Sequence, residues 1–350
     1  MSNVSVRAFR LRDVALLIRL QRQGVSLSPE QALVRSRSAL WSALLAPFPW
    51  HGIGVATYVL RGWDGRRLAH GVAQMQKRPE RPEADLLFLA PALDAHEGAG
   101  DIWYRLLGHC GYEAGQFGLQ RLFATLPDDA EMLEVFRQAC FSLYAKEEIF
   151  RLERAFRLEG SPDQGLVRPY READDWALQR LALAYTPRLV QQAEGMMNGD
   201  APLTRDPGAG LTFVLARGAE VLGAVQIETG TLGYWLRLYG NPQAVGEMRA
   251  LLLHGLSALA AYPPRPVYCG VRDYQGGART LLSDLGFRPF ATWNRLVRYT
   301  VAWAKEPALR ATPALERGVE PTMTIGHAGN GRQRERHLPE PAHAGTREPL

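Results

Sequence analysis

Two segments of this 350-residue chain recur later in the same chain, and this internal repeat constrains the fold more than any other feature. The segment Val6–Asp13 (VRAFRLRD) matches Val167–Asp174 (VRPYREAD) at an offset of 161 residues. The longer segment Arg121–Leu152 matches Val267–Arg298 without a gap, at an offset of 146 residues. The sequence therefore predicts two homologous lobes of the same architecture.

Between the matched segments, both copies show the same order of hydrophobic patterns, with period two for strands and period 3.6 for helices. The first copy predicts helices at Val14–Gln21, Ser28–Leu45 and Asp101–Phe117 and strands at Gly54–Leu60, Leu68–Met75 and Ala84–Ala90. The second copy predicts helices at Asp175–Tyr185, Pro187–Met197 and Val245–Ala261 and strands at Leu211–Ala216, Val221–Glu228 and Leu232–Tyr239. Each lobe is thus expected to be α+β (mixed α/β), with the order β-α-α-β-β-β-α-β-α-β and a mostly antiparallel central sheet flanked by helices.

The repeat also predicts how the chain is divided. We expect an N-terminal lobe at residues 1–157, a linker at 158–164 and a C-terminal lobe at 165–304. The linker sequence, LEGSPDQ, is polar and contains Gly and Pro. Residues 305–350 hold six of the 23 prolines and show no apolar periodicity, which predicts a disordered tail.

Composition argues against several classes of partner. The formal net charge is +5, but no run of five or six basic residues occurs, so we expect no nucleic-acid partner. No apolar stretch approaches the about 18–20 residues that span a bilayer, and we expect no membrane partner. The three cysteines form no C-x-x-C pair. Together with the lack of a signal-like segment, this predicts a cytoplasmic protein with reduced thiols.

The element order resembles that of the GNAT superfamily of acyl-CoA-dependent N-acyltransferases. The V-R-x-x-x-x-x-D start at Val6 and the ending LGFRPF at Leu285–Phe290 carry the resemblance, which covers residues 4–155 and 165–303. It implies acetyl-CoA or another acyl-CoA as cosubstrate, no metal, and a small-molecule amine or a peptide as acceptor.

The resemblance also implies a loop for the pyrophosphate of CoA, Arg/Gln-x-x-Gly-x-Gly/Ala, between the fourth strand and the next helix. Small residues let the backbone approach the phosphates, and the N-terminus of the helix attracts their charge. In the first lobe the candidate cofactor-binding residues are Leu89, Gly98, Ala99, Gly100 and Asp101. We expect Gly98→Val and Gly100→Val each to abolish acyl-CoA affinity.

That first loop departs from the family pattern. Ala95 stands at the Arg/Gln position, and Asp94, Glu97 and Asp101 add negative charge where the pyrophosphate would lie. An ordinary Gly-rich turn before a helix explains the same residues.

In the second lobe, Gln243 and Gly246 match two of the three motif positions. Met248 replaces the last small residue and is expected to crowd the approach of the backbone. A plain turn, capped by Asn241 with Pro242 at the first helical position, is the alternative.

The residues that the family uses for catalysis are replaced. The resemblance implies an Asn at the start of the last helix and a Tyr that protonates the departing thiolate one helical turn before the Gly-Phe pair. Gln275 and Leu282 hold these positions in the second lobe, and Asp129 and Phe136 hold them in the first. Neither Leu nor Phe can donate a proton.

Two strand carboxylates, Asp85 and Glu228, are candidate general bases, although solvated acids at strand ends explain them as well. Glu147 and Glu148 are interpreted as charges on an edge strand. His109 and His254 are expected to pack within helices.

These observations lead to three hypotheses. The first is an acyltransferase that transfers an acetyl or other acyl group to an unidentified amine. The second is a non-catalytic acyl-CoA or metabolite-binding protein on a degenerate GNAT scaffold, and the third is a structural module without cofactor.

Overall fold

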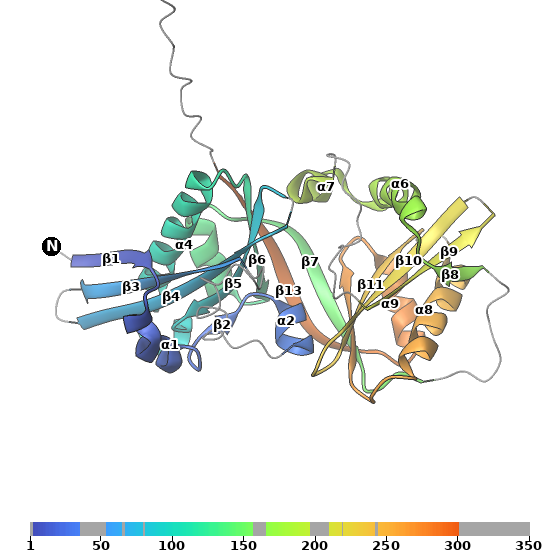
Figure 1. Cartoon of the computed structure of the whole chain (residues 1–350), viewed down its shortest axis with the longest axis horizontal. Helices are drawn as coiled ribbons and strands as arrows, with labels where there is room; N and C mark the ends of the chain where they lie inside the picture. Colours follow the sequence, from blue (N-terminus) through green and yellow to red (C-terminus); the bar gives the residue numbers. More distant parts are fainter. Residues whose placement is uncertain are drawn as a thin grey trace, which may run out of the picture. The chain divides into compact units, whose positions relative to one another are not determined.

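The computed structural model describes residues 3–35, 54–64, 67–79, 81–156, 166–196, 210–218, 220–241 and 244–300. The predicted linker at 158–164 and the predicted tail at 305–350 lie outside these ranges, so the predicted boundaries stay predictions. We call residues 3–156 lobe one and residues 166–300 lobe two. Both lobes belong to one compact unit (Figure 1).

Lobe one contains short 3-10 turns and the following helices and strands: β1 (Asn3–Ala8), α1 (Val14–Leu20), β2 (Val25–Ser26), α2 (Pro29–Val34), β3 (Val55–Asp64), β4 (Arg67–Lys77), β5 (Glu83–Ala90), α4 (Ala99–Gln116), β6 (Arg121–Pro127), α5 (Ala130–Gln138) and β7 (Ser142–Leu152). Lobe two contains β8 (Val167–Pro169), α6 (Asp175–Tyr185), α7 (Arg188–Glu194), β9 (Leu211–Arg217), β10 (Glu220–Thr229), β11 (Tyr234–Gly240), α8 (Val245–Leu259), β12 (Val267–Arg272), α9 (Gly276–Asp284) and β13 (Arg288–Tyr299). The predicted order of elements is confirmed in both lobes.

Three differences from the expected elements stand out. The strand β2, which pairs with β5, was not predicted, because two residues are too few to show a period. The helix expected at Ser28–Leu45 is described only as α2, since residues 36–53 lie outside the described ranges. The helix α8 follows Ala244 as its N-cap, not Asn241, so the expected Asn241 cap is wrong.

All these strands join one sheet, in the order β1-β3-β4-β5-β6-β13-β7-β12-β11-β10-β9-β8. Only β5 with β6 and β11 with β12 pair in parallel along this path, so the sheet is mostly antiparallel, as predicted. The two lobes thus form a mixed α/β fold around a continuous sheet.

The final strand of each lobe lies beside the last strand but one of the other lobe. The last strand of lobe two, β13, pairs with β6, and the last strand of lobe one, β7, pairs with β12. The two exchanged strands also pair with each other at the centre of the sheet (Figure 1). The sequence did not predict this exchange. It makes β7 a central strand, so the edge-strand interpretation of Glu147 and Glu148 is wrong.

The short repeat has a structural cause that is the same in both lobes. The Arg7 guanidinium donates two hydrogen bonds, of 2.7 and 2.8 Å, to the buried carboxylate of Asp13. Arg168 and Asp174 form the same pair at 2.7 and 2.6 Å. In each lobe the pair holds the first strand against the 3-10 turn that begins the first helix.

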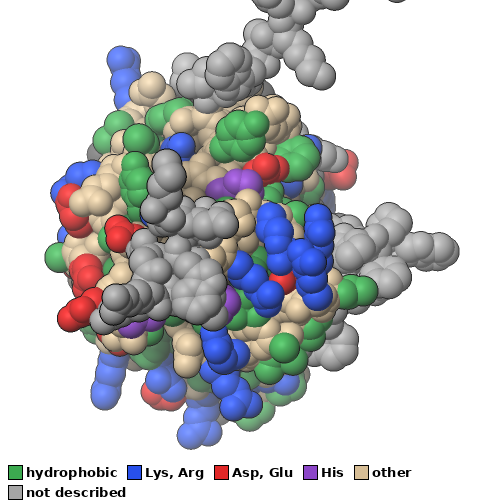
Figure 2. Space-filling view, turned by 90° about the vertical axis from the view of Figure 1, so that its left-hand side faces the viewer, with side chains coloured by type: hydrophobic (Ala, Val, Ile, Leu, Met, Phe, Trp, Pro, Cys, Tyr) green, Lys and Arg blue, Asp and Glu red, His purple; other side chains and the backbone are tan. Residues whose placement is uncertain are grey.

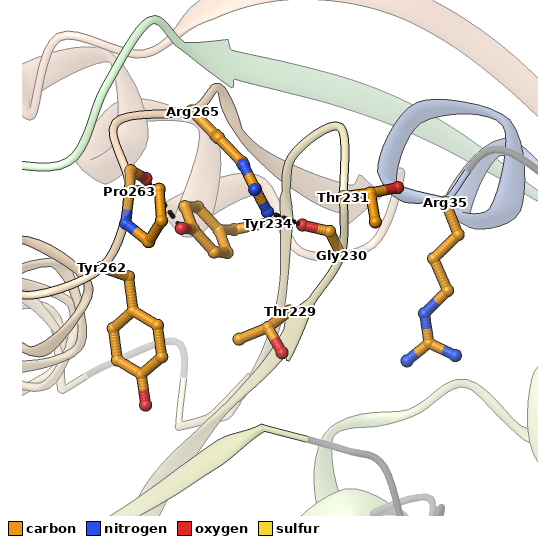
Figure 3. A pocket seen from close by; sticks show the side chains of 8 residues that line it. All are labelled: Arg35, Thr229, Gly230, Thr231, Tyr234, Tyr262, Pro263 and Arg265. Carbon is orange, nitrogen blue, oxygen red and sulfur yellow. Dashed lines mark hydrogen bonds between the residues drawn. The ribbon is translucent and has the colours of Figure 1, made fainter.

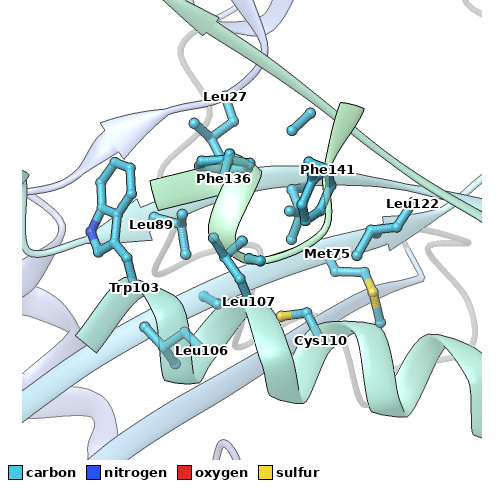
Figure 4. Close-up of a cluster of buried hydrophobic side chains, with 14 of the residues drawn as sticks. Leu27, Met75, Leu89, Trp103, Leu106, Leu107, Cys110, Leu122, Phe136 and Phe141 are labelled. Carbon is cyan, nitrogen blue, oxygen red and sulfur yellow. The ribbon is translucent and has the colours of Figure 1, made fainter. Parts of the chain in front are cut away.

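Apolar cores lie on both faces of the sheet. In lobe one, α4 packs on β3 and β4 over a cluster that includes Trp103, Leu106 and Phe136 (Figure 4). Helix α8 covers β9 and β10 of lobe two in the same way. His109 and His254 pack edge-on against Tyr58 and Phe213, with ring centroids 4.9 and 4.6 Å apart, so their expected packing role is confirmed.

Candidate functional site

In each lobe the two parallel strands pair over only three residues and then diverge. The pairs between β5 and β6 end at Asp85 and Phe123, although β5 continues to Ala90. The pairs between β11 and β12 end at Leu236 and Cys269, although β11 continues to Gly240. Each splay lies on the side of the sheet where the chain turns into a long helix, α4 or α8.

The loop before α4 borders a cavity of about 630 Å³. The predicted residues Gly98, Ala99, Gly100 and Asp101 all line it, whereas Leu89 is buried in the core. No Arg or Lys side chain is among the described residues that line this cavity, but four carboxylates are, and they belong to Asp94, Glu97, Asp101 and Glu131. This concentration of negative charge opposes a pyrophosphate.

An aromatic pair fills the space behind the same loop. The Trp103 and Phe136 rings lie edge-to-face with centroids 6.0 Å apart, and both side chains are fully buried. The indole N–H of Trp103 donates a 2.6 Å hydrogen bond to the carbonyl of Pro91. The edge of β5 beyond its last pair with β6 is also occupied, because β2 pairs with it at Phe88 and Leu89.

The loop before α8 differs in charge and packing. Gly246 is exposed, and a Cβ there would have no neighbour within 4 Å. The carboxylate of the next residue, Glu247, is paired with Arg217 at 2.5 Å. The predicted residue Gln243 lies outside the described residues.

Met248 does not crowd this loop, contrary to the expectation from sequence. Its side chain is buried and packs against Gly223 and Gly240, where a Cβ would collide with it. Ile102 packs against Gly71 in the same way in lobe one. Because α4 and α8 begin at the same offset of 146 residues as the long repeat, the small pair in lobe two is Ala244 and Gly246.

The positions that would supply an acid hold no proton donor. Phe136 and Leu282 are both fully buried in the cores. Asp129 caps α5 by accepting a hydrogen bond from the Met132 N–H, and Gln275 accepts one from the Arg272 N–H. Asp129 and Gln275 therefore bind backbone N–H groups at the starts of α5 and α9.

Both candidate bases are held by arginines. Asp85 accepts two hydrogen bonds from Arg78, of 2.7 and 2.8 Å, and Glu228 is paired with Arg237 at 2.6 Å. Their assignment as bases stays a prediction, and each would have to exchange its arginine for the substrate proton.

A cluster of charges lies between α2 and α7, where the lobes meet, and the sequence did not predict it. We call it the joint cluster, and its members are Arg237, Arg272 and Arg295 with Glu30, Glu147, Glu194 and Glu228. No local pattern could reveal it, because its partners come from β7, β10, β11, β12, β13 and the two helices.

Glu30 bridges two arginines of lobe two, Arg237 and Arg295, and the nearest contact to Arg295 is 3.6 Å. Arg295 also holds the buried Glu147 at 2.5 Å. Burial raises the pKa of Glu30, but the two guanidiniums outweigh it and hold this pKa below its ordinary value. The carboxylate therefore stays ionised at neutral pH.

Glu194 binds Arg272 at 2.6 Å and accepts a hydrogen bond of 3.0 Å from the Tyr144 hydroxyl. Burial raises its pKa too, and Arg272 more than reverses the effect. Arg237 on β11 and Arg272 on β12 come after the last β11–β12 pairs, so the joint cluster lies next to the splay of lobe two.

A further group of charged side chains lies on lobe one. The end of lobe one carries a group of basic side chains (Figure 2). At this end Arg7 and Arg61 come from β1 and β3, and both pair with Asp13. In the described part of the chain, no group of three or more His, Cys, Asp and Glu side chains could hold a metal ion. No helix among those described is long and apolar enough to cross a membrane.

No protein-family model matches the sequence, and the search of curated proteins found no match. Solved structures do match. A GCN5-related N-acetyltransferase from Sphaerobacter thermophilus is 14% identical, with a TM-score of 0.52, over 85% of this chain and 95% of its own. A tandem GNAT protein from the clavulanic acid biosynthesis pathway is 14% identical, with a TM-score of 0.48, over 85% and 98%.

A third structure is a GCN5-related glucosamine N-acetyltransferase region of a fungal multi-domain GH3 β-N-acetylglucosaminidase. It is 11% identical, with a TM-score of 0.50, over 85% of this chain and 38% of its own. At these identities the likeness to the first and third structures concerns the fold. The chain therefore has the GNAT fold, built from two lobes in tandem, as the resemblance of the sequence predicted.

Proposed function

We propose that the protein is an acyl-CoA-dependent N-acyltransferase that transfers an acetyl or other acyl group to a small amine or a peptide amine. The observation that carries this proposal is the splay of a parallel strand pair beside the N-terminus of a long helix. In lobe two the splay leaves backbone N–H and C=O groups on one edge of β11, beyond Leu236, without a pairing strand among the described residues, whereas in lobe one β2 pairs with that edge of β5. These groups can pair with the amides of the pantetheine arm, as a strand edge pairs with a peptide.

We further propose that lobe two holds the acyl-CoA. Its loop offers an open Gly246 at the start of a 15-residue helix, and the carboxylate of the adjacent Glu247 is already paired with Arg217. Lobe one offers Gly98 and Gly100 but surrounds them with carboxylates, and β2 already pairs with the β5 edge at its splay. Electrostatics therefore favours lobe two for a cosubstrate that carries a pyrophosphate.

The reaction proposed for this site does not require a side chain that acts as a general acid. The nitrogen of a neutral amine attacks the thioester carbonyl, and the tetrahedral intermediate collapses and expels the CoA thiolate. A thiol of ordinary pKa, about 8.5, leaves readily as a thiolate, so a Leu at the acid position does not stop the reaction. The amine proton passes to the thiolate or to solvent, and the protein contributes chiefly by positioning.

Calorimetric titration of acetyl-CoA tests the proposal, with Gly246→Val as the principal variant and Gly100→Val, at the equivalent position of lobe one, as its matched control. A Cβ at either glycine has no contact closer than 3.8 Å, so neither variant should disturb the fold. We expect one equivalent of acetyl-CoA to bind, at least tenfold weaker binding in Gly246→Val, and unchanged binding in Gly100→Val. Loss in Gly100→Val alone would restore the assignment to lobe one, and no binding by the parent protein would refute the proposal.

Release of free CoA in the presence of pooled amines then tests catalysis. The buried Phe136 and Leu282 specifically favour the second hypothesis, a non-catalytic acyl-CoA-binding protein. Turnover above the rate without protein supports the enzyme, whereas saturable binding without turnover supports the binding protein.

A further inference from the structure

A second cavity lies at the opposite end of β11 from the proposed acyl-CoA loop. Its volume is about 440 Å³, and it is bordered by the β10–β11 turn, the loop between α8 and β12, and the residue that follows α2. Arg35 comes from lobe one, whereas the other lining residues come from lobe two. None of the sequence motifs or the proposed catalytic residues belongs to this cavity.

The side chains that line this cavity offer hydrogen-bond donors, and none of the described lining residues is acidic. Two guanidiniums and several hydroxyls line it, and no described Asp or Glu does. Among the described residues, no carboxylate pairs with Arg35 or Arg265. An anion is therefore the charge that the cavity attracts.

Two hydrogen bonds fix the walls in place. Arg265 donates to the carbonyl of Gly230, and the Tyr234 hydroxyl donates to the carbonyl of Pro263 at 2.7 Å (Figure 3). A guanidinium carries five N–H donors, so this bond leaves Arg265 able to bind a ligand as well.

Figure 3 shows Tyr262 to the left and Arg35 to the right of the β10–β11 turn, with Thr229 between them, and both long side chains extend downward in the view. The Tyr262 ring is 41% exposed and packs edge-on against Tyr234, with centroids 6.4 Å apart. The cavity therefore combines cationic and hydroxyl donors with an accessible aromatic surface.

We propose that this cavity binds a small molecule that joins an anionic group, a phosphate or a carboxylate, to an aromatic or apolar body. The anion accepts hydrogen bonds from Arg35 and the hydroxyls, because a guanidinium fork matches two oxygens of either group. The body lies against Tyr262. Such a ligand contacts both lobes, and it does so beside the place where Gly230 packs closely on the carbonyl of Val34.

The test is calorimetric titration of the full chain with phenyl phosphate and with benzoate, and with benzyl alcohol as the neutral probe. We expect saturable binding of at least one anion and none of benzyl alcohol, and the tighter anion distinguishes phosphate from carboxylate. Arg35→Gln should weaken this binding at least tenfold, and Thr229→Val should weaken it less.

The matched control is Arg137→Gln, which removes a charge from an arginine on α5 that is 64% exposed. It should bind the anion as the parent protein does. The proposal is overturned if neither anion binds saturably, if Arg35→Gln and Arg137→Gln bind equally well, or if acetyl-CoA displaces the anion, which would place the probe in the cosubstrate site.

Discussion

Neutralising two different carboxylates of the joint cluster should have unequal effects on stability. Glu30→Gln and Glu194→Gln each remove one negative charge from four carboxylates that face three guanidiniums. Net charge therefore changes identically in the two variants. What differs is which arginine loses its partner.

The structure sets the size of each effect. Without the Glu30 carboxylate, Arg237 keeps Glu228 at 2.6 Å and Arg295 keeps Glu147 at 2.5 Å. No guanidinium is left unpaired, so we expect a loss of about 1–1.5 kcal/mol, the range of a single hydrogen bond. In Glu194→Gln, Arg272 loses the one carboxylate that pairs with it among the described residues. An uncompensated buried charge costs about 3–5 kcal/mol, and because Arg272 is 18% exposed we expect about 3 kcal/mol.

Urea unfolding of the parent and both variants at pH 7, followed by circular dichroism, measures these losses. The expected difference of about 2 kcal/mol exceeds the usual error of such measurements. Gln replaces Glu with the same shape, so packing changes little. Equal losses, or a larger loss in Glu30→Gln, would show that net charge and not local pairing governs the cluster, and would refute the reasoning.

Two further predictions concern stability. Gly230→Ala should lower the free energy of unfolding by about 1–3 kcal/mol, because the added Cβ collides with the backbone carbonyl of Val34. Gly108→Ala should raise it by about 0.5–1 kcal/mol in the same urea assay, because Gly108 lies in the middle of α4 with open space around its Cβ position. Destabilisation of both to the same degree would contradict this assignment of close contact. The hydrogen bonds from Arg7 lower the pKa of Asp13 below its ordinary value of 3.8, so the pair stabilises the fold above that pH and loses its effect as the pH falls through the lower folded-state pKa. Asp13→Asn should therefore cost about 2–3 kcal/mol at pH 7, and the difference from the parent should shrink at pH 3; a constant difference would exclude the carboxylate as its cause.

Local patterns were enough to predict the elements of each lobe. The repeated Arg–x₅–Asp spacing marked a real structural unit, because Arg7 and Asp13 lie six residues apart and fold against each other. The long strands and helices followed from hydrophobic period, whereas the pairing of the final strands did not. The motif in lobe two was harder to place, because a buried Met248 and an exposed small residue look alike when only spacing is considered.

The joint cluster was beyond such patterns, because its contacts join distant segments. Glu30 and Arg237 are separated by 207 residues, and Arg295 and Glu147 by 148. Each residue alone looks like an ordinary charge on a strand or helix. Only the three-dimensional arrangement shows that they lie together, mostly shielded from solvent, and are paired.

The exchange of β7 and β13 explains both the cluster and the failure to predict it. A repeat in the sequence shows that two copies of a fold exist. It does not show whether the final strand of one copy pairs with the preceding strand of its own copy or with that of the other, because the two edges are equivalent. The pairings β13 with β6 and β7 with β12 therefore look the same in sequence as pairings within each lobe. Once exchanged, β7 carries Glu147 of lobe one into contact with Arg295 on β13, which belongs to lobe two. The joint cluster thus depends on strands from both copies, so neither copy alone can assemble it next to the splay of lobe two.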